Sequence, residues 1–150
     1  MALFKNLTDE LKSAMRAKDT LKLEALRAIK SALILAKTAS AGDIVLSEDE
    51  EIKLLQKLVK QRKDSAAIYR EKNRDDLATT EEAQAYVISQ FLPEQMSPDA
   101  IEKIVDEIIA KTRAEGMKDM GKVMGTASKE MLGKADGKTI STIVKKRLNG

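Results

Sequence analysis

The sequence predicts an all-α protein, with an N-terminal four-helix domain followed by a small C-terminal three-helix domain. Three observations predict this class. Apolar residues recur every three or four positions through most of the 150 residues, which is the period of a helix with one buried face. Only two prolines occur, and both lie in one short stretch, Pro93 to Pro98. No useful length of sequence alternates apolar and polar residues, so no strand is predicted.

The first two predicted helices are separated by a break at Lys18–Asp19. Leu7 and Leu11 lie four residues apart on one face of the first helix, and Asp19 or Thr20 can cap the second. The second helix covers about residues 21–38. Its apolar stripe is wide enough that we expect burial around much of its circumference. The stripe consists of Leu23, Leu26, Ile29, Leu33, Ile34, Leu35 and Ala36.

The third and fourth predicted helices each begin with the spacing of a capping box. Ser47 precedes Glu50 by three residues, and acidic residues in that first turn also suit the helix dipole. The apolar pattern continues to about residue 73, which makes this the longest helix. Thr79 precedes Glu82 by the same spacing, and Pro93 is expected to end the fourth helix.

The stretch from Leu92 to Pro98 is the best domain boundary, because two prolines bracket it and the charge balance changes across it. We therefore predict domains at residues 1–95 and 96–150. Ser97 is the expected cap of the fifth helix, with Pro98 at its first position.

Glycine and aspartate mark the later joints. Gly116 is the expected C-cap of the fifth helix, and Asp136 the N-cap of the seventh, which runs to Leu148. The sixth helix covers about residues 119–132. Its methionines are expected in the core, because methionine fills irregular gaps in small cores. They are Met120, Met124 and Met131.

The composition excludes several kinds of catalytic site. The chain has no cysteine and no histidine, which rules out disulfides, thiolate nucleophiles and imidazole general bases. A zinc site would need carboxylates alone. We therefore predict no catalytic or metal-ligating residues, and no cofactor is indicated. No apolar run approaches the ~20 residues that span a bilayer, so we expect no membrane partner and a cytoplasmic protein.

Basic charge gathers towards the C-terminus. Residues 1–96 hold 16 basic and 16 acidic side chains, whereas residues 117–150 hold 8 basic and 3 acidic ones. A phosphate-contacting surface and a merely solvated surface explain this equally well. No aromatic residue follows Phe91, so nucleic acid would be contacted by its backbone and shape and not by base stacking. The candidate nucleic-acid-binding residues are Lys118, Lys122, Lys129, Lys134, Lys138, Lys145 and Lys146.

Two glycine patterns allow further interpretations. The segment Gly133–Thr139 looks like a phosphate loop, but three residues instead of four follow its first glycine, and a helix precedes it where a strand is required. We interpret it as a helix C-cap, a short link and an aspartate cap. Gly121 and Gly125 lie one turn apart and would admit a phosphate backbone or a partner helix, although packing within the domain is favoured.

Six stretches together resemble the YqeY-like family, and the C-terminal part is similar to the tail domain of the GatB subunit of tRNA-dependent amidotransferases. No one stretch is specific, but they follow in the expected order over nearly the whole chain. They are Leu26–Ala32, Gln61–Ser65, Arg74–Ala78, Phe91–Ser97, Asp119–Gly125 and Gly133–Gly137.

The resemblance implies a two-part helical protein associated with glutamine-dependent amidation of mischarged aminoacyl-tRNA. It implies tRNA as a partner, and an amidotransferase or aminoacyl-tRNA synthetase as a candidate protein partner. Lys122 and the segment Gly133–Ala135 match positions of the tail domain, which helps to hold tRNA. One departure is visible: the family tends to be acidic across the fourth helix, where this chain has Gln84, Tyr86 and Gln90.

Three functional hypotheses follow. The leading one is a tRNA-binding or amidotransferase-associated module without its own active site. The second is a carbon–nitrogen ligase with glutamine as amide donor, although neither a cysteine nucleophile nor a Ser-Ser-Lys core is recognisable. The third is a protein-interaction adaptor that uses Arg62, Lys63 and the face of the third helix.

Overall fold

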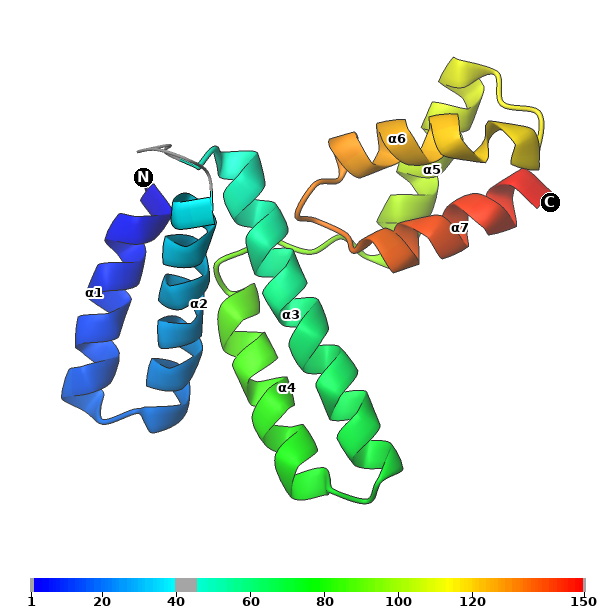
Figure 1. The fold of residues 1–150 in the computed structure, drawn as a ribbon. Coiled ribbons are helices and arrows are strands. Elements are labelled where there is room, and N and C mark those ends of the chain that lie inside the picture. Colours follow the sequence, from blue (N-terminus) through cyan, green and yellow to red (C-terminus); the bar gives the residue numbers. More distant parts are fainter. Residues whose placement is uncertain (1, 40–45, 150) are drawn as a thin grey trace. The chain divides into compact units, whose positions relative to one another are not determined.

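The computed structural model describes residues 2–39 and 46–149 (Figure 1). Over these residues the protein is all-helical and has no strand, which confirms the predicted fold class. The predicted loop at residues 40–43 lies outside the described part. The helices are α1 (Ala2–Ala17), α2 (Thr20–Ala39), α3 (Glu48–Glu71), α4 (Asp75–Ser89), α5 (Pro98–Thr112), the short 3₁₀ helix η1 (Met117–Asp119), α6 (Met120–Glu130) and α7 (Gly137–Asn149).

The chain divides into two compact units, of which the first ends at Leu92 and the second begins at Pro93. Each unit has its own aliphatic core. The sequence predicts the boundary slightly later, after Gln95. The difference has a physical reason, because Gln95 and Met96 form hydrogen bonds with residues of the second unit.

Helix α2 is the centre of the first unit. Among the described residues it contacts α1, α3 and α4, whereas α1 contacts α2 alone. Leu26, Ile29 and Leu33 are fully buried on its inner face. Ile34 and Leu35, however, are 47% and 70% exposed, so the expectation of burial around much of the circumference is wrong. The neighbouring helices cover one stripe, and each residue step turns the helix by about 100° out of that stripe.

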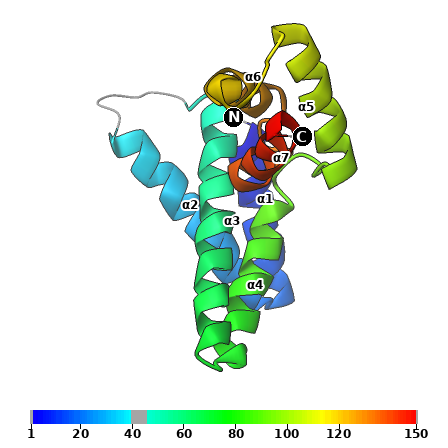
Figure 2. The same ribbon diagram turned by 90° about the vertical axis from the view of Figure 1, so that its right-hand side faces the viewer.

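Helices α3 and α4 run side by side in both views of the ribbon, as Figure 2 shows, and they share the largest helix–helix contact in the first unit. The predicted capping box at Ser47 is confirmed: its Oγ accepts from the Glu50 N–H at 3.2 Å, and its own N–H donates to Glu50 Oε2 at 2.8 Å. The one predicted at Thr79 is wrong. Helix α4 begins at Asp75, and the Thr79 hydroxyl donates to the Asp75 carbonyl inside the helix at 2.7 Å.

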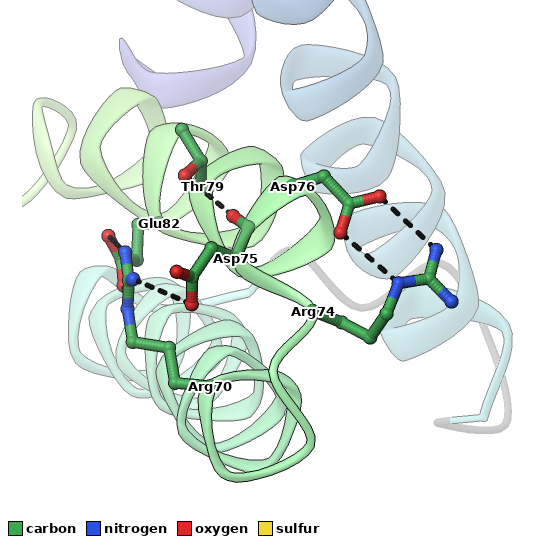
Figure 3. Close-up of polar contacts among 6 residues, drawn as sticks. All are labelled: Arg70, Arg74, Asp75, Asp76, Thr79 and Glu82. Atoms are coloured by element: carbon green, nitrogen blue, oxygen red, sulfur yellow. Dashed lines mark hydrogen bonds and ion pairs between the residues drawn. The ribbon is translucent and has the colours of Figure 1, made fainter.

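Two arginines fix the start of α4 (Figure 3). Arg70 on α3 grips Glu82 on α4 through two parallel hydrogen bonds of 2.7 and 2.9 Å, and also lies 3.4 Å from Asp75. Arg74 holds Asp76 through two bonds of 3.2 Å. These contacts lower the pKa of Glu82 and of Asp76, chiefly through the hydrogen bonds that each arginine donates. The arginines thus use acidic residues of α4 to tie the hairpin together.

A chain of polar side chains connects three helices of the first unit. Arg62 on α3 donates to the amide oxygen of Gln84 on α4 at 3.1 Å, and the Gln84 amide nitrogen donates to Glu24 on α2 at 3.3 Å. A glutamate at position 84 would lack that donor and would place a second negative charge beside Glu24. The contact therefore explains why this chain tolerates a neutral residue at 84.

Neighbouring carboxylates in the first turn of α3 have opposite pKa shifts. The backbone N–H of Ser47 and then its hydroxyl lower the pKa of Glu50. Glu51 is only 7% exposed, and its burial raises its pKa above the ordinary value of 4.5. A carboxylate with a raised pKa favours the folded state when protonated, and this contribution disappears as pH rises through its folded pKa. For Glu50 the sign is reversed.

We therefore expect Glu51→Gln to stabilise the protein at neutral pH, because the glutamine carries no charge to desolvate. The gain should shrink on acidification and vanish below the ordinary pKa of 4.5. Denaturant unfolding at several pH values measures it, with Glu50→Gln as the matched control of opposite sign. An NMR titration in which Glu51 is deprotonated before Glu50 would contradict the assignment.

The second unit is built from α5, α6 and α7, which contact one another pairwise. The predicted caps at Ser97 and Asp136 are confirmed, since each side chain accepts a backbone N–H. The predicted C-cap at Gly116 is wrong. Helix α5 ends at Arg113, which takes the left-handed conformation with φ of 55°, whereas Gly116 is extended at φ of 173°. The expected methionine core is confirmed, with Met131 fully buried and Met120 and Met124 packed against it.

We expect the second unit to fold by itself if the link is kept. A fragment of residues 93–150 should unfold cooperatively, whereas residues 97–150 should be less stable by about 2 kcal/mol, because two hydrogen bonds of the link are lost. Chemical denaturation followed by circular dichroism compares the two fragments. If residues 93–150 show no cooperative transition, the second unit depends on the first for its stability.

Candidate nucleic-acid interface

The core of the second unit determines which face of α6 points outward. Val123 and Ala127 are fully buried against α5 and α7. Residues on the opposite side of the helix are exposed, and we call them the α6 outer face. It consists of Lys118 on η1 and of Gly121, Lys122, Gly125 and Lys129 on α6. The spacing of three, four and seven residues places these positions along one side of the helix.

All seven predicted lysines are exposed, but the structure places them on three different elements. Lys118, Lys122 and Lys129 belong to the α6 outer face. Lys134 lies in the loop between α6 and α7. The rest are on α7, where Lys138 and Lys145 are seven residues apart and therefore share a side of the helix. They are Lys138, Lys145 and Lys146.

Two of the seven ammonium groups have partners within the second unit. Lys118 lies 3.2 Å from a carboxylate oxygen of Glu115, and both side chains are more than 70% exposed. An exposed pair of this kind contributes at most about 1 kcal/mol, so this lysine remains available to an anion. Lys122 donates a long hydrogen bond of 3.5 Å to the carbonyl of Thr112 at the end of α5.

The other five ammonium groups have no hydrogen-bond or ion-pair partner within the described part of the chain. This distinguishes them from the arginine beside them. Arg147 is held internally, with two hydrogen bonds to Asp106 at 2.7 and 2.8 Å and one to Glu102 at 3.0 Å. Those bonds raise its pKa, the one to Asp106 most strongly. The five lysines are Lys129, Lys134, Lys138, Lys145 and Lys146.

The glycines of α6 do not serve internal packing. A Cβ added at Gly121 or Gly125 would meet no described atom within 4 Å, and both residues are exposed. The interpretation that they allow a neighbouring helix of the same domain to pack closely is therefore wrong. They leave a low strip of helix surface beside Lys122 and Lys129.

The loop between α6 and α7 is well held and does not have the properties of a phosphate loop. Gly133 has φ of 78°, the left-handed conformation that glycine adopts without strain. The carboxylate of Asp136 accepts from the Thr139 N–H at 2.6 Å. A carboxylate of the protein thus occupies the N-terminus of α7, where a bound phosphate would otherwise be favoured.

Three structural findings bear on other kinds of site. Within residues 2–39 and 46–149 no group of three or more acidic side chains is arranged to hold a metal ion. No described helix is long and apolar enough to cross a membrane. Arg62, which the adaptor hypothesis uses, is half-buried and already bonded to Gln84 and to the Leu58 carbonyl.

Sequence reasoning missed Gln95, which proves to be a neighbour of the candidate interface. Its amide donates to the Gly133 carbonyl at 2.6 Å. The only signal in the sequence was its place inside the link, because a contact across 38 residues leaves no local pattern.

The family described as Yqey-like protein matches residues 4–148. The chain belongs to the YqeY-like family. The match spans both structural units, so the family membership concerns the whole architecture and not the basic unit alone.

Two kinds of relative accompany this family match. The fungal Altered inheritance of mitochondria protein 41 is 35% identical in Vanderwaltozyma polyspora, over 76% of this chain and 64% of that protein. In Saccharomyces cerevisiae strain YJM789 the identity is 30% over 91% of this chain and 71% of the relative. A glutamyl-tRNA(Gln) amidotransferase component from Thermococcus gammatolerans is 37% identical over 57 residues, which are 35% of this chain and 9% of that protein.

The open surroundings of Gly125 lead to a stability prediction. Gly125→Ala should raise the free energy of unfolding by about 0.5–1 kcal/mol, because alanine restricts the unfolded chain and meets no neighbour. Thermal and denaturant unfolding measure the change. Ala127→Gly, a fully buried position on the same helix, is the reference that should destabilise. A destabilised Gly125→Ala variant would mean that an unseen contact requires the glycine.

Proposed function

We propose that this protein is a tRNA-binding module of the YqeY-like family that has no active site of its own. The observation that carries the proposal is the α6 outer face, where exposed lysines stand beside glycines that no neighbour needs. Lysine ammonium groups neutralise phosphates, and a strip without side chains lets a sugar–phosphate backbone approach the helix closely. Lys134 at the adjoining loop extends the same charge.

The choice of tRNA over other anions is supported by resemblance. A stretch of 57 residues is similar to part of an amidotransferase that is named for glutamyl-tRNA(Gln). The absence of aromatic residues from the second unit suits recognition by shape and backbone. From the same similarity we propose an amidotransferase as protein partner, and an aminoacyl-tRNA synthetase as the alternative.

The ligase hypothesis has less support in the residues of this chain. Amide transfer from glutamine requires a nucleophile that forms an acyl intermediate, and the chain has no cysteine. No described lysine has a resolved pKa shift of the kind that marks a buried, activated amine. We therefore assign the protein a binding role in amidation and no chemical step. Release of ammonia from glutamine by the purified protein would reverse this assignment.

Direct binding of tRNA by the full chain tests the proposal. In fluorescence anisotropy with labelled tRNA, affinity should fall steeply between about 50 and about 200 mM salt, as expected when lysines displace counterions from phosphates. Lys129→Glu combined with Lys134→Glu should weaken binding by about tenfold or more, because two phosphate contacts become repulsive.

The matched control changes charge equally on the other side of the unit. Lys103→Glu combined with Lys111→Glu alters two exposed lysines of α5, which also carries four acidic residues. We expect this variant to bind nearly as well as the wild type. Equal weakening by both pairs would mean that only net charge matters, and no binding of the wild type at low salt would refute the function.

A cytoplasmic localisation remains part of the proposal. The fungal relatives carry names that place those proteins in mitochondria. Imaging of a tagged chain in its native host decides between the two compartments.

A further inference from the structure

The link between the two units is bonded to the loop that carries Lys134. The Gln95 side-chain amide donates to two carbonyls, that of Gly133 at 2.6 Å and that of Pro93 at 2.9 Å. The next residue continues the contact, since the Met96 N–H donates to the Lys134 carbonyl at 2.8 Å. Two consecutive carbonyls of the loop are thus held by two consecutive residues of the link.

The same loop is also fixed from its inner side. Gly133 and Ala135 are buried, whereas Lys134 between them is exposed. The Lys134 N–H donates to the Met131 carbonyl at 3.0 Å, and Met131 itself is fully buried. The backbone of Lys134 is therefore bonded at both its N–H and its carbonyl. Its side chain leaves the unit from a defined point, next to the left-handed turn at Gly133.

We infer that Gln95 is a positioning residue for the proposed tRNA interface. It holds the Gly133–Lys134 peptide so that the Lys134 ammonium is presented to a phosphate without a further ordering step. Preorganisation of this kind increases affinity because less conformational freedom is lost on binding. The inference rests on the proposed tRNA binding, but it concerns a residue that carries no charge and lies outside the α6 outer face.

A double-mutant cycle on the full chain tests the inference. Gln95→Met keeps the length of the side chain and removes its donor. In the wild-type background it should weaken tRNA binding by about threefold to tenfold, within the range of coupling between residues that share a network. In the Lys134→Gln background it should have no further effect, because there is no ammonium left to position. Gln90→Met, at an exposed glutamine of the first unit, is the matched control and should bind as the wild type does.

Backbone NMR relaxation of the free protein provides a readout that does not depend on tRNA. Gln95→Met should increase the mobility of the Gly133, Lys134 and Ala135 amides while the far-UV spectrum stays unchanged. Unaltered mobility of these amides, or additive effects in the cycle, would overturn the positioning role. If the wild type binds tRNA but the cycle is additive, only the role of Gln95 is wrong. If the wild type does not bind, the proposed function fails and this inference fails with it.

Discussion

One-sided burial of α6 is the constraint on which the second unit depends. Val123, Ala127 and Met131 are each fully buried, and burial of one aliphatic side chain of valine size or larger contributes about 1.5–3 kcal/mol. Rotation of α6 by one residue, about 100°, would expose this face and bring Lys122 towards the core, where an unpaired charge is costly. Hydrophobic packing therefore determines where the lysines and glycines of α6 point.

The cations of the second unit divide into two classes according to side-chain chemistry. The planar guanidinium of Arg147 can pair with Asp106 and Glu102 at once, and it ties α7 to α5. The lysines of α6, the loop and α7 have compact, strongly hydrated ammonium groups, and most of them have no partner within the described residues. Net charge from the sequence counts both classes equally. Only the contacts separate structural charge from charge that is available to a ligand.

Local signals predicted much of the fold, and non-local contacts explain what they missed. Apolar spacing gave the helices and the cores, and the caps at Ser47, Ser97 and Asp136 are formed by residues three apart in sequence. The Thr79 pattern misled because the Arg70 and Glu82 ion pair lets α4 begin earlier. The exposure of the candidate lysines followed from helix periodicity. Their partners, and the contact of Gln95 with the loop, depend on the tertiary arrangement of α5, α6 and the link.

The glycines of α6 link the physics of the fold with the proposed function. Glycine inside a helix is less favourable than alanine by about 0.5–1 kcal/mol, and such a cost is normally explained by a neighbour that needs the space. Gly121 and Gly125 have no such neighbour among the described residues. Lysines flank them on the same helix, so the missing neighbour would be anionic as well as closely approaching. A sugar–phosphate backbone has both properties, whereas a solvated surface would require the lysines and leave the glycines unexplained.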